Sequence, residues 1–110
     1  MKAGVFLDGV QVGALKNWSL EEKYEVLSQD DRGRPSSQRI IGWTASAVRY
    51  LIKRADLAGK ELGFKFISIH GDQERICTGK ITTEYKTGEA AEGPLEIEGD
   101  KAPQIIWRRI

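Results

Sequence analysis

The chain has 110 residues, of which 40% are hydrophobic and 30% are charged, so it is long enough for one domain around a single core. Its formal net charge of +1 argues against a general binder of polyanions, because such proteins are usually clearly basic. The one cysteine, Cys77, excludes a disulfide within the chain, and no stretch approaches the roughly 20 apolar residues that a membrane-spanning helix needs. We therefore expect one cytosolic domain over residues 1–110, or one released from a cytosol, without a membrane anchor.

The first segment, residues 3–16, predicts a β-hairpin. Two β-prone runs, residues 5–7 and 10–12, flank the dipeptide Asp8-Gly9. An Asp-Gly pair between apolar residues is the strongest short-range signal for a hairpin turn.

Residues 18–27 fit two different periods. A strand would place four large apolar residues on one face: Trp18, Leu20, Tyr24 and Val26. A helix is favoured by the spacing of Leu20, Tyr24 and Leu27 and by a capping box of Ser19 with Glu22. The pattern leaves both open.

Residues 28–39 read SQDDRGRPSSQR and contain no apolar side chain except a proline. We expect an extended loop at residues 28–40. Its charge belongs to a wider division of the chain, because residues 32–54 hold six basic residues and no acid, whereas residues 84–100 hold six acids and one lysine. If these stretches lie on opposite sides of the domain, copies can meet head to tail.

The segment at residues 42–59 also fits both periods, and a strand that passes into a short helix at about Leu51, with Gly59 as its stop signal, satisfies them together. The rest of the chain predicts strands. Alternating runs are joined by a turn at residues 70–73, and two short closing strands follow residue 93. The expected fold is mainly β (α+β): a small antiparallel β-sandwich or half-barrel with one short flanking helix.

The residues that could carry chemistry are few. The chain has one histidine, His70, and one cysteine, so no zinc cluster can form, and we expect no metal, no cofactor and no enzymatic activity. A DNA-binding regulator of the winged-helix or helix-turn-helix type is an alternative. It requires helices at residues 19–28 and 44–58, with residues 64–85 as a wing and basic residues on the second helix. A monomeric β domain that binds another protein is a third possibility.

The order of these pieces resembles a known family. The run GVFLDGVQVGALKNWSLEEKYEV, a long polar loop and then IIGWTASAVRYL are similar to the tail tube proteins of contractile-tailed phages and related prophage elements. Such chains have an Asp-Gly or Asn-Gly turn before a short strand, a strand opening with Trp-Ser, and an extended loop before a glycine-rich strand with a short helix. ELGFKFISI and EGPLEIEGD resemble later strands of that family. The resemblance covers most of the chain and concerns architecture and composition, not an invariant motif.

Two departures from the family pattern stand out. Ala45, Ser46 and Ala47 occupy positions where glycine is more typical, and the ending KAPQIIWRRI has no clear counterpart. These departures are compatible with a shorter relative of the tail tube proteins, such as a tube initiator or a baseplate tube component.

The resemblance implies a structural virion protein. Its copies, six to a ring, would join edge to edge so that their sheets close one continuous β-barrel around a channel, and the rings would stack into a tail tube through which genome DNA passes without specific binding. It further implies a location in the virion tail, and in the host cytoplasm during assembly, with other copies of the chain and sheath, baseplate or tape-measure proteins as partners.

Three sets of residues follow as candidates for these contacts. The inter-subunit docking loop would use Arg32, Arg34, Ser36, Gln38 and Arg39. The complementary acidic patch of another copy would use Glu89, Glu92, Glu96, Glu98 and Asp100. A channel for DNA should avoid condensed positive charge, so the lumen would be lined by polar strands with some acids, either Ser19, Glu21, Lys23 and Glu25 or Lys80, Thr82 and Glu84.

Overall fold

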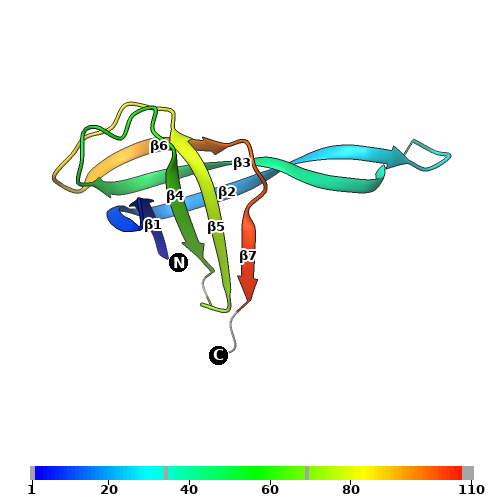
Figure 1. The fold of residues 1–110 in the computed structure, drawn as a ribbon, viewed down its shortest axis with the longest axis horizontal. Coiled ribbons are helices and arrows are strands. Elements are labelled where there is room, and N and C mark those ends of the chain that lie inside the picture. The colour runs from blue at the N-terminus through cyan, green and yellow to red at the C-terminus, as the bar shows by residue number, and fades with distance from the viewer. Residues whose placement is uncertain (1, 34, 69, 108–110) are drawn as a thin grey trace.

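The computed structural model of the protein describes residues 2–33, 35–68 and 70–107. They form seven strands, all paired antiparallel: β1 (Lys2–Leu7), β2 (Val10–Gln29), β3 (Pro35–Ile52), β4 (Leu62–Ile67), β5 (Gln73–Ile81), β6 (Ala91–Gly99) and β7 (Gln104–Trp107) (Figure 1). The prediction of a mainly antiparallel β fold is confirmed.

The hydrogen bonds between strands close into a ring. The strand order is β4-β1-β2-β3-β6-β5-β7, and β4 also pairs with β5. β5 therefore uses one edge for β4 and divides the other, with residues 73–76 opposite β7 and residues 80–81 opposite β6. Because six strands close on themselves within one chain, most backbone edges of the body are already paired.

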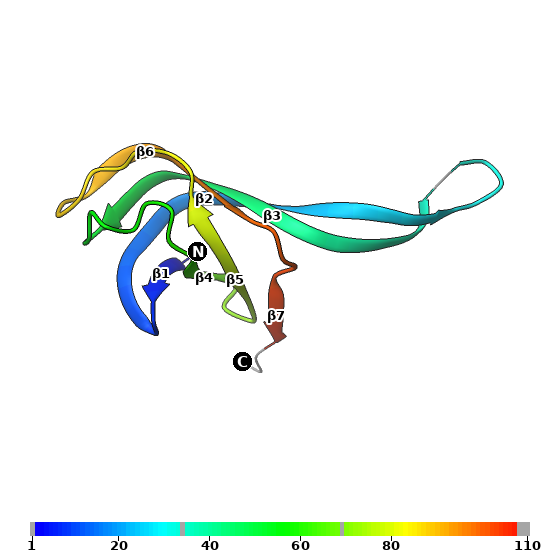
Figure 2. The ribbon, with the colours of Figure 1, turned by 45° about the horizontal axis from the view of Figure 1, so that its top comes forward.

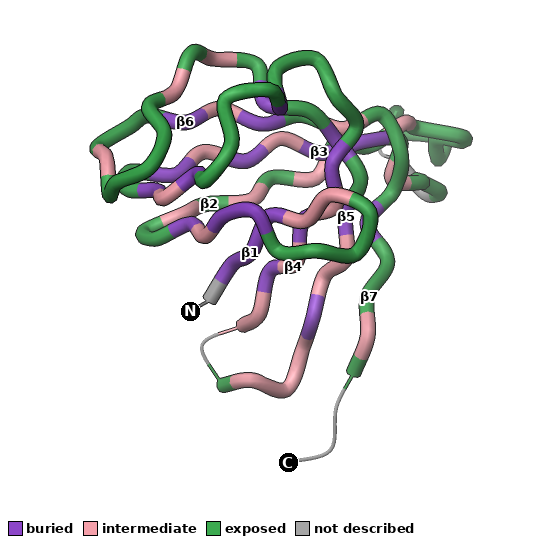
Figure 3. The backbone as a smooth tube through the Cα atoms, turned by 60° about the vertical axis from the view of Figure 1, so that its left-hand side comes forward, coloured by how far each residue is buried: buried purple, intermediate pink, exposed green. Residues whose placement is uncertain are grey.

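The core fills the inside of this ring. Buried positions alternate along β4 and along residues 43–47 of β3, and Figure 3 shows that the buried residues gather in the body of the molecule. At the centre is Trp43, which is fully buried, with ring centroids 5.5 Å from Phe64 and 5.9 Å from Phe66. Its indole N–H donates to the Thr78 carbonyl at 3.2 Å, so the polar group of this buried side chain has a hydrogen-bond partner.

The first hairpin forms as predicted. β1 pairs with β2 around Asp8 and Gly9, whose φ values of 52° and 81° are those of a two-residue turn with both central residues left-handed. The ambiguity at residues 18–27 is resolved in favour of the strand, because β2 runs through this segment and stays paired with β3. The capping-box reading of Ser19 and Glu22 was wrong.

The short helix expected from Leu51 is wrong as well. β3 stays paired with β2 as far as Ile52, which lies opposite Gly13, and the described residues beyond it form turns up to β4. Leu57 anchors these turns: it is fully buried, and its backbone N–H donates to the Tyr85 hydroxyl at 3.0 Å. The apolar spacing that suggested a helix arises from strand residues plus one loop residue that reaches the core.

Candidate assembly surfaces

The most unusual feature of the fold is the outer part of the β2–β3 hairpin, residues 23–42, which we call the arm. It projects from the body along the longest dimension of the molecule (Figures 1 and 2). β1 pairs with β2 only as far as Leu15, and β6 reaches β3 only at Trp43. In the described structure, the two strands of the arm therefore pair only with each other, and their outer edges carry no further strand.

The extended loop expected at residues 28–40 is largely this arm. The strands continue to Gln29 and resume at Pro35, with Ser28 opposite Ser37. At the tip, the Gly33 N–H donates to the Asp30 carbonyl at 3.0 Å, which makes a tight turn. The expectation of a loop was wrong because strand pairing uses backbone groups, and a ribbon solvated on both faces needs no apolar alternation.

The arm exposes large apolar side chains. Tyr24, Val26, Leu27 and Ile41 are 55%, 45%, 54% and 44% exposed. Leu27 and Ile41 are the extra residues at two shifts of register, where two residues of one strand oppose one of the other. The side chains at these bulges face solvent in the single chain, which is costly unless something covers them.

The predicted docking residues belong to this arm, and one of the arginines is already paired within the chain. The Arg39 Nη2 lies 2.6 Å from the Glu25 Oε2, so this arginine is paired within its own arm. Arg32 is exposed at the tip, and Gln38 lies opposite Val26. Arg34 lies outside the described residues, as does the side chain of Ser36.

The predicted acidic patch lies mostly on β6, which is a direct neighbour of β3. Arg49 approaches Glu92 at 3.8 Å, and the Ser46 hydroxyl donates to Glu96 at 3.0 Å. The basic and acidic stretches therefore touch within one chain along the body, and the arm carries part of the basic stretch away from β6. Glu89, Glu98 and Asp100 form no ion pair with any residue that the structure describes.

Members of both alternative lumen sets meet on one face of the sheet: Ser19 and Glu21 from the first set and Lys80 from the second. The register places a row across four strands on the outer side of the ring: Glu21 opposite Thr44, Thr44 opposite Glu98, and Glu98 opposite Lys80. A second row joins Ser19, Ser46 and Glu96. We call these seven residues the polar face.

Of the remaining lumen candidates, Thr82 adjoins this face. Thr82 follows β5 and donates from its backbone N–H to the Glu96 carbonyl at 2.9 Å, and Glu84 is exposed in the segment after it. Glu25 lies outside the polar face, because it is on the arm and paired with Arg39.

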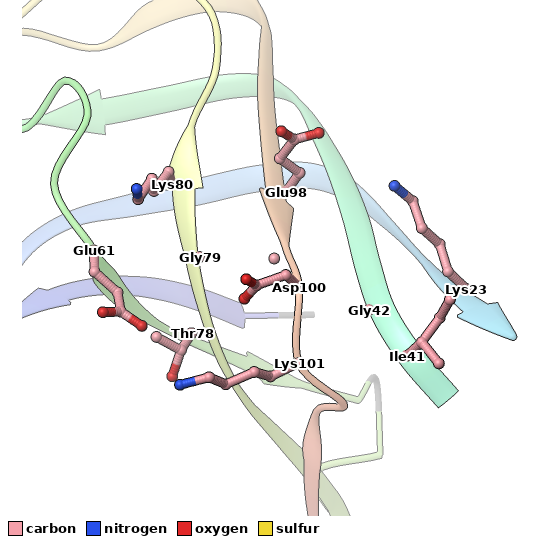
Figure 4. Close-up of a pocket in the computed structure, with 11 residues that line it drawn as sticks. Lys23, Ile41, Gly42, Glu61, Thr78, Gly79, Lys80, Glu98, Asp100 and Lys101 are labelled. Atoms are coloured by element: carbon pink, nitrogen blue, oxygen red, sulfur yellow. The ribbon is translucent and has the colours of Figure 1, made fainter. Parts of the chain in front are cut away.

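A cleft of about 620 Å³ lies at the arm end of the polar face. Its charged side chains are mixed, with three lysines and three carboxylates: Lys23, Lys80, Lys101, Glu61, Glu98 and Asp100. Figure 4 shows Lys23 on the arm side of the cleft and Glu61 on the opposite side, with glycines between them. In the described part of the chain, no group of three or more His, Cys, Asp or Glu side chains is arranged to hold a metal ion.

The glycines in this cleft serve the fold. β6 turns from β3 toward β5 here, and a Cβ added at Gly79 would overlap the Glu98 carbonyl oxygen and the Trp43 ring. A Cβ at Gly42 would lie 2.6 Å from the Gly99 carbonyl oxygen. The backbones can approach this closely only without side chains.

The single thiol, that of Cys77, lies on β5 and is buried. Cys77 is 2% exposed, and burial raises the pKa of its thiol to about 12. The thiol is therefore protonated at neutral pH and out of reach of solvent.

Comparison of the chain with protein-family models, with curated proteins and with solved structures found no match. The part of the chain that the structure describes contains no helix able to cross a membrane.

Proposed function

We propose that this chain is a structural subunit that assembles with copies of itself, and that it is a tail tube subunit, or a close relative, of a phage or prophage element. One observation carries the proposal: among the described residues, a long two-stranded arm pairs only with itself, and it exposes apolar side chains at its bulges. An isolated two-stranded ribbon is marginally stable in water, and exposed edges with apolar side chains promote pairing with another chain.

The shape favours a head-to-tail arrangement. The molecule extends over 54 × 34 × 25 Å, and the arm occupies one end of its longest dimension. An arm at one end meets a different surface on the next copy, so the contact is heterologous and builds a closed ring or an open filament. Stacked rings with such arms form a tube.

The polar face suits the lining of a channel. It combines small hydroxyl side chains with Glu21, Glu96 and Glu98 and a single lysine, Lys80. Phosphates passing such a surface meet little condensed positive charge, so DNA slides without being held. In a virion tail, genome DNA would pass along this face, and sheath, baseplate or tape-measure proteins would contact the outside or ends of the tube.

The alternative of a winged-helix or helix-turn-helix regulator loses its structural basis. The two segments that it needs as helices, residues 19–28 and 44–58, lie largely in β2 and β3. A monomeric domain that binds another protein is the remaining alternative, and the experiment below separates it from self-assembly.

The test removes the apolar side chains at the bulges of the arm. We expect the double variant Leu27→Ser/Ile41→Ser to remain folded but to lose the concentration-dependent oligomers of the unaltered protein in light scattering. Val48→Ser is a matched control, because Val48 is 57% exposed but lies on the body. Assembly of the arm variant at the unaltered concentration would refute the proposal, as would equal loss of assembly in the control.

A second variant tests the charges of the arm. Reversing Arg32, Arg34 and Arg39 to glutamate should block stacking, because it replaces three positive charges of the docking segment with negative ones and removes the Arg39–Glu25 pair. Assembly that proceeds unchanged would show that these arginines take no part in docking.

A further inference from the structure

An ion pair joins the base of the arm to the opposite side of the ring. Glu22 lies on β2 immediately before the arm, and Arg75 lies on β5. The Arg75 Nε donates to the Glu22 Oε1 at 2.9 Å. β2 and β5 are not neighbours in the sheet, so this contact spans the interior of the ring and not a strand pair.

The contact is sheltered and extended by further hydrogen bonds. The side chains of Arg75 and Glu22 are 32% and 12% exposed. The second carboxylate oxygen of Glu22 accepts from the Tyr24 hydroxyl at 3.1 Å, and the Arg75 Nη1 donates to the Gln73 side chain at 3.1 Å. This network connects the first residues of the arm to the part of β5 that pairs with β7.

The arm needs such a connection. Within the described part of the chain it leaves the body through two strands, and a bulge lies at its base, between Lys23 and Tyr24 opposite Ile41. Bulges bend and twist a strand, so the backbone alone defines the direction of the arm weakly. An ion pair shielded from solvent is screened less by salt than an exposed one.

We propose that the Glu22–Arg75 pair is a brace that fixes the direction in which the arm leaves the body, so that the arm is held ready for docking before it meets another copy. Glu22 and Arg75 are thus positioning residues, and they need not touch the partner. The effect on assembly rests on the function proposed above, whereas the effect on the direction of the arm does not.

The Arg39–Glu25 ion pair, which lies within the arm, does not fix the direction of the arm. Arg39 and Glu25 join β3 to β2 within the arm, and their side chains are 63% and 44% exposed. This pair moves with the arm as a unit, and it therefore provides a matched control.

The direction of the arm can be measured in dilute monomer. Spin labels at Ser37→Cys on the arm and Gln104→Cys on β7 report the distance between these two elements, and the buried Cys77 with its raised thiol pKa does not compete for the label. We expect a narrow distance distribution with Glu22 and Arg75 intact. Glu22→Gln and Arg75→Gln should each broaden it at least about twofold, whereas Arg39→Gln should leave it unchanged.

Two controls separate loss of the ion pair from loss of the fold. Circular dichroism selects the variants that keep the β fold, and Arg75→Lys, which retains the charge but loses the guanidinium geometry, serves if the Gln variants unfold. The exchanged pair Glu22→Arg/Arg75→Glu should narrow the distribution again. An unchanged distribution in every folded brace variant would overturn the proposal.

Assembly gives a second, separable readout. If a flexible arm is competent to dock only part of the time, the concentration at which Glu22→Gln assembles should rise about tenfold. A broadened distribution together with no assembly of the unaltered protein would overturn the proposed function and support the brace. Normal assembly of the unaltered protein with no change of distribution in Glu22→Gln would support the function and overturn the brace.

Discussion

Replacing Trp43 with phenylalanine should destabilise the fold strongly, because this side chain is fully buried at the centre of the ring and donates a hydrogen bond to Thr78. Loss of that hydrogen bond costs about 1 kcal/mol. The smaller ring leaves a cavity of about 40 Å³, which at about 24 cal/mol per Å³ costs about 1 kcal/mol. Loss of about 40 Å² of buried apolar area costs about 1 kcal/mol more.

Trp43→Phe should therefore lower the free energy of unfolding by about 3 kcal/mol. For a chain of this size the melting temperature should fall by about 10–15 °C. The assay is urea unfolding followed by far-UV circular dichroism in dilute protein, so that assembly does not add to the stability. The midpoint should shift while the dependence on urea stays the same.

Trp107→Phe is the matched control, since Trp107 is 71% exposed on the edge strand β7. Its free energy of unfolding should change by less than about 0.5 kcal/mol. A cost below about 1 kcal/mol for Trp43→Phe, or an equal cost for the two tryptophans, would refute the assignment of Trp43 as the centre of the core.

Three further substitutions test separate parts of the account. Gly9→Ala should lower the free energy of unfolding by about 1 kcal/mol in thermal unfolding, because Gly9 has a φ of 81°, which is unfavourable for alanine. An added Cβ would meet no atom within 4 Å, so the effect comes from the backbone alone, and an unchanged stability would contradict the turn. Gly79→Ala should cost about 1–3 kcal/mol by urea unfolding, because the new methyl group overlaps the Glu98 carbonyl and the Trp43 ring, and a stable variant would argue against the tight strand crossing. Burial raises the pKa of the Cys77 thiol to about 12, whereas in the unfolded chain the thiol has a pKa of about 8.5. The protonated thiol therefore contributes its full stabilisation below about pH 8.5, and this contribution is lost as the pH rises toward 12. Cys77→Ala should therefore lose less stability than the unaltered protein between pH 8.5 and pH 12 in parallel unfolding titrations.

Parts of the fold could be predicted because their signals are local. Asp8-Gly9 determines a turn with its neighbours alone, and the alternation along residues 62–67 reflects a strand with one buried side. The helix expected from Leu51 failed because pairing with β2 holds β3 extended as far as Ile52, and no local residue reports that pairing.

The candidate surfaces depended on contacts that the order of residues does not reveal. A polar run looks like a loop, and only the pairing of Ser28 with Ser37 shows that it is part of an arm. The division into basic and acidic stretches suggested opposite sides, but the β3–β6 pairing places Arg49 beside Glu92.

The polar face and the Glu22–Arg75 pair also depend on contacts between residues far apart in the sequence. One member of each lumen set shares a row of the polar face, because the strand register connects Glu21 to Lys80 through Thr44 and Glu98. The Glu22–Arg75 contact joins strands that are not adjacent in the sheet, and nothing in either local segment indicates it.

Electron microscopy of the purified protein tests whether the arm builds assemblies of this chain. The protein would be concentrated stepwise in moderate salt, stained and imaged, with its mass followed by light scattering in the same samples. We expect rings or tubes with a central hole that grow in number with concentration. A monodisperse monomer at every concentration would contradict it.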